Sequence, residues 1–128
     1  MRYLISTCFM VMQTFFIQPA FANEAEQADK LIPVTEQAFV KSINQFSKAD
    51  IISQFGEPAK ADDVKIKGSN KIVASIWLYH FINTTEDGTY YPTTELDFID
   101  DKVVMVAFLN NDGTETEMPV QEYTIPAQ

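Results

Sequence analysis

Few residues of this 128-residue chain have the types and spacing that catalysis or metal binding requires. The only histidine is His80, and two carboxylates, Glu95 and Asp97, occur in the next apolar run. If the two runs are adjacent antiparallel strands, these three side chains could approach one another and offer ligands to a metal ion such as zinc. A lone histidine between two aromatic residues of a strand is more often a hydrogen-bonded structural residue. We therefore expect no metal site and no catalytic role for His80.

The acidic stretch over residues 110–117 carries oxygen ligands of the kind that calcium prefers. It lacks the roughly twelve-residue ligand spacing of a calcium loop, and Asp112-Gly113 has the chemistry of a hairpin turn. The chain contains no nucleophile elbow and no phosphate-binding loop, and its single cysteine, Cys8, lies near the N-terminus. The sequence thus predicts a protein that is not an enzyme and has no cofactor.

Residues 1–22 have the features of a secretory signal peptide. Arg2 precedes an apolar run over residues 3–17 and the motif Ala20-Phe-Ala22, whose small residues suit a signal peptidase. The run is shorter than the roughly 20 residues that a membrane-spanning helix needs. Cys8 lacks the small preceding residue of a lipid-modified cysteine. We expect cleavage after Ala22, no membrane anchor, and a periplasmic or secreted protein.

The composition narrows the classes of partner. The formal net charge is −9, and no arginine follows residue 22. Nucleic acids and anionic membranes require cationic patches, so we expect neither as a partner. No cysteine follows residue 22 either, so the core must be stable without disulfides. We expect a disordered leader over residues 23–33 and a single domain over residues 34–128.

The domain is expected to begin with two helices. Residues 35–45 have apolar side chains at intervals of one or two helical turns. Residues 48–55 follow Ser47, a typical N-cap residue, and precede Gly56, which stands where a left-handed residue ends a helix. Pro58 prevents that helix from continuing.

Three strands are expected to follow these helices. Residues 72–82, 90–99 and 102–109 are rich in β-branched and aromatic side chains and are separated by turn-forming residues. The segments 59–71 and 120–125 could add an edge strand. The sequence therefore predicts an α+β fold, with two N-terminal helices packed on a three-stranded, or at most four-stranded, antiparallel meander sheet.

Three motifs resemble those of a known family. They are Ser47-x-x-Asp50-Ile51-x-x-x-Phe55-Gly56-Glu-Pro58, Trp77-x-Tyr79, and Leu96-x-Phe98-x-Asp100-x-Lys102-Val103. Over residues 47–109 the chain is similar to the SmpA/OmlA (BamE-like) small outer-membrane lipoproteins. The resemblance implies two helices on a three-stranded antiparallel sheet and a role in envelope assembly.

The chain departs from this family in two respects. The lipid-bearing cysteine is absent, which argues against an outer-membrane anchor, and Phe55 replaces the more usual leucine. Similar modules occur in proteins that bind and inhibit β-lactamases. The resemblance therefore also implies an inhibitor-type module as an alternative.

Both faces of the expected strands are apolar, whereas an antiparallel sheet with one solvated face should alternate apolar and polar residues. Helices can cover one face, and a partner or the C-terminal tail must cover the other. The partner would be an envelope or secreted protein, or a second copy in a homodimer. If the tail covers the face, Trp77 belongs to the core instead. The candidate interface residues are Trp77, Tyr79, Phe81, Met105 and Leu109.

We therefore expect an exported, non-catalytic protein-binding or envelope-assembly module. The alternative is a small ligand-binding or hydrolase-like periplasmic domain with a pocket between the helices and the sheet. In that case His80 or a carboxylate would act on the ligand. The pocket wall would then contain Trp77, Tyr79, Tyr90 and Tyr91.

The mature protein should begin at Asn23, because the signal peptidase motif ends at Ala22. N-terminal sequencing of protein recovered from the cell envelope measures this directly. A chain that keeps residues 1–22, or one that partitions into detergent, would contradict the prediction.

Overall fold

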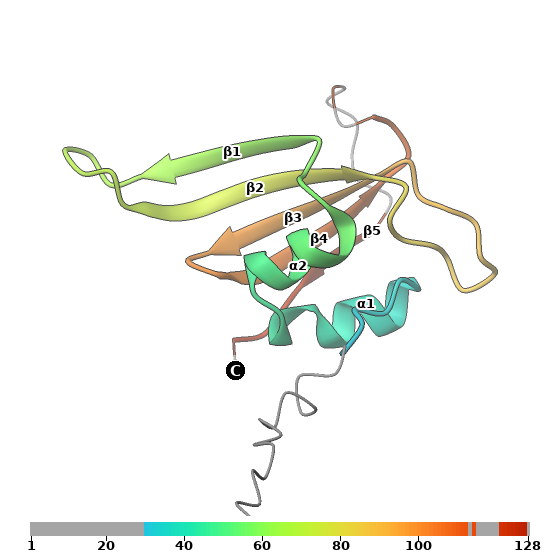
Figure 1. The fold of residues 1–128 in the computed structure, drawn as a ribbon. Helices are drawn as coiled ribbons and strands as arrows, with labels where there is room; N and C mark the ends of the chain where they lie inside the picture. Colours follow the sequence, from blue (N-terminus) through green and yellow to red (C-terminus); the bar gives the residue numbers. More distant parts are fainter. Residues whose placement is uncertain (1–29, 113, 115–120, 128) are drawn as a thin grey trace, which may run out of the picture. The chain divides into compact units, whose positions relative to one another are not determined.

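A computed structural model describes residues 30–112, 114 and 121–127 of the chain (Figure 1). Leu31–Gln128 form one unit, and Met1–Lys30 form a separate one. The predicted signal peptide and most of the predicted leader lie outside the described residues. Within the described ranges, no helix is long and apolar enough to cross a membrane.

The first predicted helix is present as α1 (Glu36–Ser42), followed by a 3₁₀ turn, η2 (Ile43–Gln45). The Ser42 hydroxyl donates to the carbonyl oxygen of Ala38 at 2.8 Å, a type of bond that bends helices. The second predicted helix is confirmed with its bounds as α2 (Lys48–Phe55). The amide of Asp50 donates to Ser47 Oγ at 3.2 Å, and the Asp50 carboxylate accepts from the Ser47 amide at 2.8 Å. This reciprocal cap fixes the start of α2.

Helix α2 ends at Gly56, whose amide donates to the carbonyl oxygen of Ile52 at 2.8 Å. A left-handed conformation was expected here, and φ is positive, at 81°. The ψ of −172° places Gly56 outside the left-handed helical region, in a conformation that only glycine adopts readily. A side chain at this position would therefore strain the backbone even though nothing lies within 4 Å of an added Cβ atom.

Among the described residues, five strands form one antiparallel sheet in the order β1-β2-β3-β4-β5. The predicted three-stranded, or at most four-stranded, sheet is therefore wrong, although the α+β arrangement holds. All six residues of the first strand are exposed, so no apolar alternation marks it in the sequence. The strands are β1 (Lys60–Lys65), β2 (Ile72–His80), β3 (Thr93–Ile99), β4 (Lys102–Leu109) and β5 (Gln121–Thr124).

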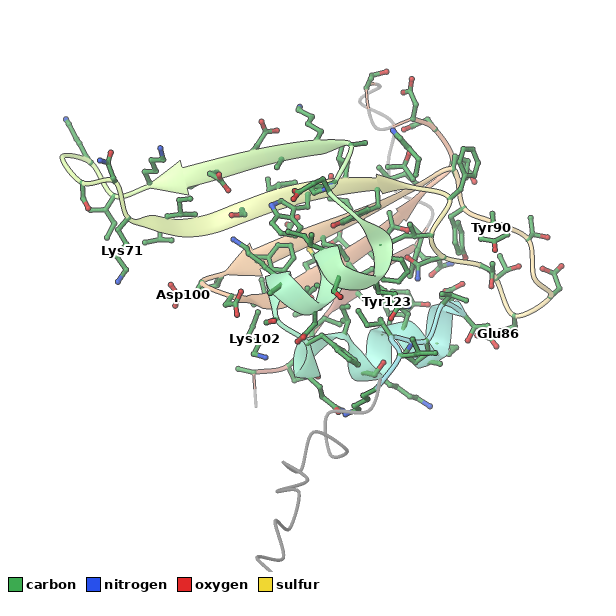
Figure 2. The ribbon with its side chains drawn as sticks, viewed as in Figure 1. Lys71, Glu86, Tyr90, Asp100, Lys102 and Tyr123 are labelled. Carbon is green, nitrogen blue, oxygen red and sulfur yellow. The ribbon has the colours of Figure 1, made fainter. Side chains whose placement is uncertain are left out.

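The connection between β2 and β3 is longer than expected, because β2 ends at His80 rather than at residue 82. Phe81 has a φ of 53°, which turns the chain out of the strand. The connection projects beyond the sheet and carries Glu86 and Tyr90 (Figure 2). Its base is joined to the segment before α1, since the Thr84 amide donates to the Val34 carbonyl oxygen at 3.0 Å.

A single hydrophobic core lies between the helices and one side of the sheet. Phe39 of α1 and Ile51 of α2 are fully buried, and so is Leu96 at the centre of β3. The rings of Phe39 and Phe108 meet edge to face, with centroids 6.3 Å apart. Both helices therefore lie on the same face of the sheet, which we call the covered face (Figure 1).

The fold starts before residue 34, because Ile32 belongs to this core and is only 2% exposed. Its amide donates to Gln54 Oε1 at 2.7 Å, and its carbonyl oxygen accepts from Gln54 Nε2 at 2.9 Å. The end of the predicted disordered leader is thus bound to α2 through one side-chain amide.

Replacing Gly56 with valine should lower the free energy of unfolding by at least about 1 kcal/mol, because valine must adopt the positive φ at this helix end. Urea denaturation followed by circular dichroism measures the change. Ser53→Val is the matched control, since Ser53 is an exposed residue of the same helix and serine and valine have similar helix propensities. Equal midpoints for the two variants would mean that the end of α2 carries no backbone constraint.

Candidate functional site

Trp77 and Tyr79, two of the expected interface residues, point to the covered face. They are 7% and 3% exposed. The Trp77 ring lies 4.7 Å from that of Phe98, and the Tyr79 hydroxyl donates to the carbonyl oxygen of Gly56 at 2.9 Å. Both residues are part of the core, so a partner cannot reach them in the folded chain. Burial raises the pKa of the Tyr79 hydroxyl to about 12, and the charge of Glu57 adds to this effect.

The other three expected interface residues do not share a surface with these two. Met105 pairs with Asp97 and lies on the opposite face of the sheet, half-buried. Leu109 is buried at the end of β4, and Phe81 is 63% exposed but lies beyond the end of β2. The five residues therefore do not form one interface.

The aromatic pocket of the alternative hypothesis is not present among its expected wall residues. Trp77, Tyr79 and Tyr91 are buried, and Tyr91 stacks on Phe108 with a centroid distance of 4.7 Å. Tyr90 is exposed on the β2–β3 connection (Figure 2). The buried rings fill the space that a ligand would need.

A lysine, a serine and an aspartate form a hydrogen-bonded chain across α2, β2 and β1. Lys48 Nζ donates to Ser75 Oγ at 2.8 Å, and Ser75 Oγ donates to Asp63 Oδ1 at 2.6 Å. These are residue types that can activate a serine nucleophile, but here the serine proton is bound by Asp63 and Lys48 acts as a donor. Ser75 is also only 1% exposed, so a substrate cannot reach it. The Lys48–Ser75–Asp63 hydrogen bonds instead connect the exposed strand β1 to β2 and α2.

A second polar cluster joins α1 to β5 and to the end of the β2–β3 connection. The hydroxyls of Tyr91 and Tyr123 each donate to one oxygen of the Glu36 carboxylate. Burial is the main cause that raises the pKa of Tyr91, and the hydrogen bond to Glu36 is the main cause for Tyr123. Both carboxylate oxygens are occupied, so the cluster has a structural role.

The three residues considered for a metal site do not come together as ligands. His80 Nδ1 lies 3.1 Å from Thr93 Oγ1 and 3.3 Å from the Pro92 carbonyl oxygen. His80 pairs with Thr93, whereas Glu95 pairs with Leu78 one row farther along the sheet. Within the described part of the chain, no group of three or more histidine, cysteine, aspartate or glutamate side chains could hold a metal ion.

The remaining candidate is the second face of the sheet, opposite α1 and α2 (Figure 1). We call it the open face. Leu78 and Ala107 are buried on this face, whereas Ile76 and Ile99 are exposed. At its centre, Glu95 and Asp97 stand two residues apart on β3 and therefore on the same side. The register places Ile76 and Met105 beside Asp97, and it places Leu78 and Ala107 beside Glu95. Two carboxylates are thus enclosed by aliphatic and thioether side chains.

This environment disfavours the charged form of both carboxyls. Burial raises the pKa of Glu95, and the charge of Asp97 and a hydrogen bond between the two carboxyls raise it further. Burial is also the main cause that raises the pKa of Asp97, whereas the hydrogen bond with Glu95 lowers it. Glu122 on β5 adds a like charge to both groups. Asp97 Oδ1 is shielded from water and has no hydrogen-bond partner among the described residues.

An exposed aliphatic rim adjoins the two carboxylates. Val64, Ala74 and Ile99 follow one another across β1, β2 and β3, in the row beyond Ile76 and Asp97. Val64 is 53% exposed and Ile99 is 57% exposed, and Ile76 is 40% exposed. A surface with large aliphatic side chains around a half-buried polar centre is suited to bind another molecule.

The sequence contains one signal for this centre. Glu95 and Asp97 are the only charged residues inside the predicted strand 90–99, and their spacing of two puts them on one face. The same spacing made them candidate metal ligands together with His80. Their position opposite the helices cannot be read from the spacing.

Comparison with models of known protein families, with curated proteins and with solved structures found no match for this chain. The similarity to the BamE-like lipoproteins therefore remains a resemblance of three motifs.

The Glu95→Gln variant should be more stable than the parent near neutral pH, by roughly 0.5–1 kcal/mol. Folding raises the pKa of both carboxyls. The contribution of the two carboxyls to the free energy of unfolding is fully present at pH values below their pKa values in the unfolded chain, which are about 4. This contribution is lost as the pH rises through their pKa values in the folded chain. The expected gain is small because solvent screens a half-buried pair.

Urea denaturation at about pH 7 and about pH 4 measures this difference, which should shrink at the lower pH as the parent's carboxyls bind protons. Glu57→Gln removes an exposed carboxylate after α2 and should change the stability little at either pH. A Glu95→Gln variant less stable than the parent at neutral pH would show that the pair supports the fold.

Proposed function

We propose that this chain is an exported, non-catalytic protein-binding module that uses the open face of its sheet to bind an envelope or secreted protein. The observation that carries the proposal is the Glu95–Asp97 pair, held half-buried among apolar side chains with Asp97 Oδ1 unpaired among the described residues. The partner would place a basic side chain against this pair and aliphatic side chains against the rim formed by Val64, Ile76 and Ile99.

The two carboxylates are expected to lower the stability of the fold at neutral pH, because folding raises the pKa of both. Side chains that weaken a fold at neutral pH offer no structural benefit, and such residues are typical of binding sites. A lysine or arginine from a partner would supply an opposite charge to the pair and a hydrogen-bond donor to Asp97 Oδ1. The exposed aliphatic side chains would add hydrophobic contact area around it.

The net charge of the chain also favours a partner with a basic surface. The formal net charge of −9 attracts basic surfaces at long range. On the open face, Lys60 of β1 forms an ion pair with Asp62 at 3.1 Å, so it does not neutralise the central pair. Glu122 extends the acidic region to β5.

Site-specific photo-crosslinking in the native host tests this proposal. A photoreactive amino acid is placed at Ile76 or Ile99 on the open face, and at Ser53 on the exposed side of α2 as the control. We expect a discrete adduct of the same mass from the first two positions and none from Ser53. Adding a carboxylate with Ile99→Glu should abolish the adduct from Ile76, because it adds a charged, hydrated group to the aliphatic rim that the partner must cover.

Two outcomes would contradict the proposal. Adducts from Ser53 without adducts from the open face would move the interface to the helices. An adduct of twice the mass of the chain would identify a second copy as the occupant in place of another protein. Circular dichroism of each variant verifies that the fold is retained.

A further inference from the structure

A separate cavity of about 510 Å³ opens beside the C-terminal segment. Its wall combines η2, the adjoining ends of β3 and β4, and the residues after β5. The volume is typical of pockets that bind small molecules, which span roughly 300–1,000 Å³. The lining residues are Asn44, Gln45, Ile99, Lys102, Val103, Val104, Ile125, Pro126 and Ala127.

Aliphatic side chains supply the inner wall of this cavity. Val103 is 2% exposed and Ile125 is 4% exposed, so both are fixed by the core. The Ile125 amide donates to the Val104 carbonyl oxygen at 2.8 Å, which holds the C-terminal segment against β4. Asn44 Nδ2 donates to the carbonyl oxygen of Pro126 at 3.4 Å across one side of the cavity. The site is therefore formed in the folded chain.

The charge of the lining is opposite to that of the whole chain. None of the lining residues is acidic, although the chain has 18 acidic residues, and Lys102 is the only charged residue of the lining. Lys102 stands at the start of β4 and extends on the side of the C-terminal segment (Figure 2). An apolar wall with one ammonium group complements an apolar molecule that carries one negative charge.

Two of the three acidic side chains near Lys102 accept hydrogen bonds from backbone amides, and the third points away from the helices. Lys102 lowers the pKa of Asp50, but the hydrogen bonds from Ser47 are the larger causes, and the Asp50 carboxylate accepts from the Ser47 amide. Asp101 Oδ1 accepts from the Lys48 amide at 3.1 Å. Asp100 has a φ of 53° in the β3–β4 turn and points away from the helices (Figure 2).

We infer that this cavity binds a small monocarboxylate with an aliphatic body, of the medium-chain fatty acid type. Its carboxylate would pair with the Lys102 ammonium group, and its chain would lie against Val103, Val104 and Ile125. This site contains neither residue of the Glu95–Asp97 pair, but it shares Ile99 with the aliphatic rim of the open face. Its test therefore uses substitutions at Lys102 and Val104, which are not part of that rim.

Three probes with the same hydrocarbon chain test the inference: octanoate, octanol and octylamine. Titration of the full mature chain is followed by two-dimensional NMR and by calorimetry. We expect octanoate to shift the amide signals of Val104 and Ile125, with a Kd at least about tenfold lower than that of octanol. Octylamine should bind more weakly than octanol, because its charge has the same sign as that of Lys102.

Two substitutions test separately the charge of Lys102 and the volume of the cavity. Lys102→Met keeps most of the length of the side chain and should remove the preference for octanoate over octanol. Lys71→Met, on the β1–β2 hairpin (Figure 2), is the matched control and should leave that preference unchanged. Val104→Trp should fill the cavity and weaken binding of both probes. Circular dichroism and the amide signals outside the cavity verify the fold of each variant.

The inference is overturned if octanoate shifts no signals at the cavity up to its solubility limit. It is also overturned if octanoate and octanol bind equally to the parent, or if Lys71→Met lowers the preference as much as Lys102→Met. Failure of the crosslinking experiment at the open face leaves each of these results unaffected.

Discussion

The sheet of this protein carries large apolar side chains on both sides, although the helices cover only one of them. Strands β2, β3 and β4 contribute large side chains to the core under α1 and α2, and Leu96 at the centre of that core is completely buried. Because successive residues of a strand alternate between faces, the same strands also present Ile76, Met105 and their neighbours away from the helices. Burial of the first set supplies the stability, and the second set is what remains available for contact with another molecule.

The parts of the fold that local chemistry determines were predictable. The bounds of α2 follow from Ser47 at one end and Gly56 with Pro58 at the other, and β4 follows directly from the Asp100-Asp101 turn. Strand β1 lies in the segment 59–71, which was expected only as a possible edge strand, because its position depends on backbone pairing with β2 and on the Lys48–Ser75–Asp63 hydrogen bonds. The sequence of β1 has no alternation of apolar and polar residues from which these contacts could be predicted.

The candidate site was harder to predict than the fold. The sequence showed that two faces are apolar, but the side on which the helices pack depends on contacts between residues far apart in the chain. Trp77 and Tyr79 have the side chains expected of an interface, and their rings are instead enclosed by Phe98 and Phe55. Glu95 and Asp97 became candidate binding residues because the strand register places them among Ile76, Leu78 and Met105. The sequence alone does not contain this register. The cavity beside Lys102 unites three segments that no sequence pattern connects.

The order of the strands has a consequence for the way in which the chain folds. Each strand pairs with the strand that precedes or follows it in the sequence, so the sheet can form as successive hairpins. Such local pairing keeps the cost of closing loops low and favours rapid folding. Contacts that join distant segments, such as that between Phe39 and Phe108, then attach the helices to the sheet. A chain that crosses a membrane unfolded would benefit from this order, because most of its sheet could assemble before its ends meet.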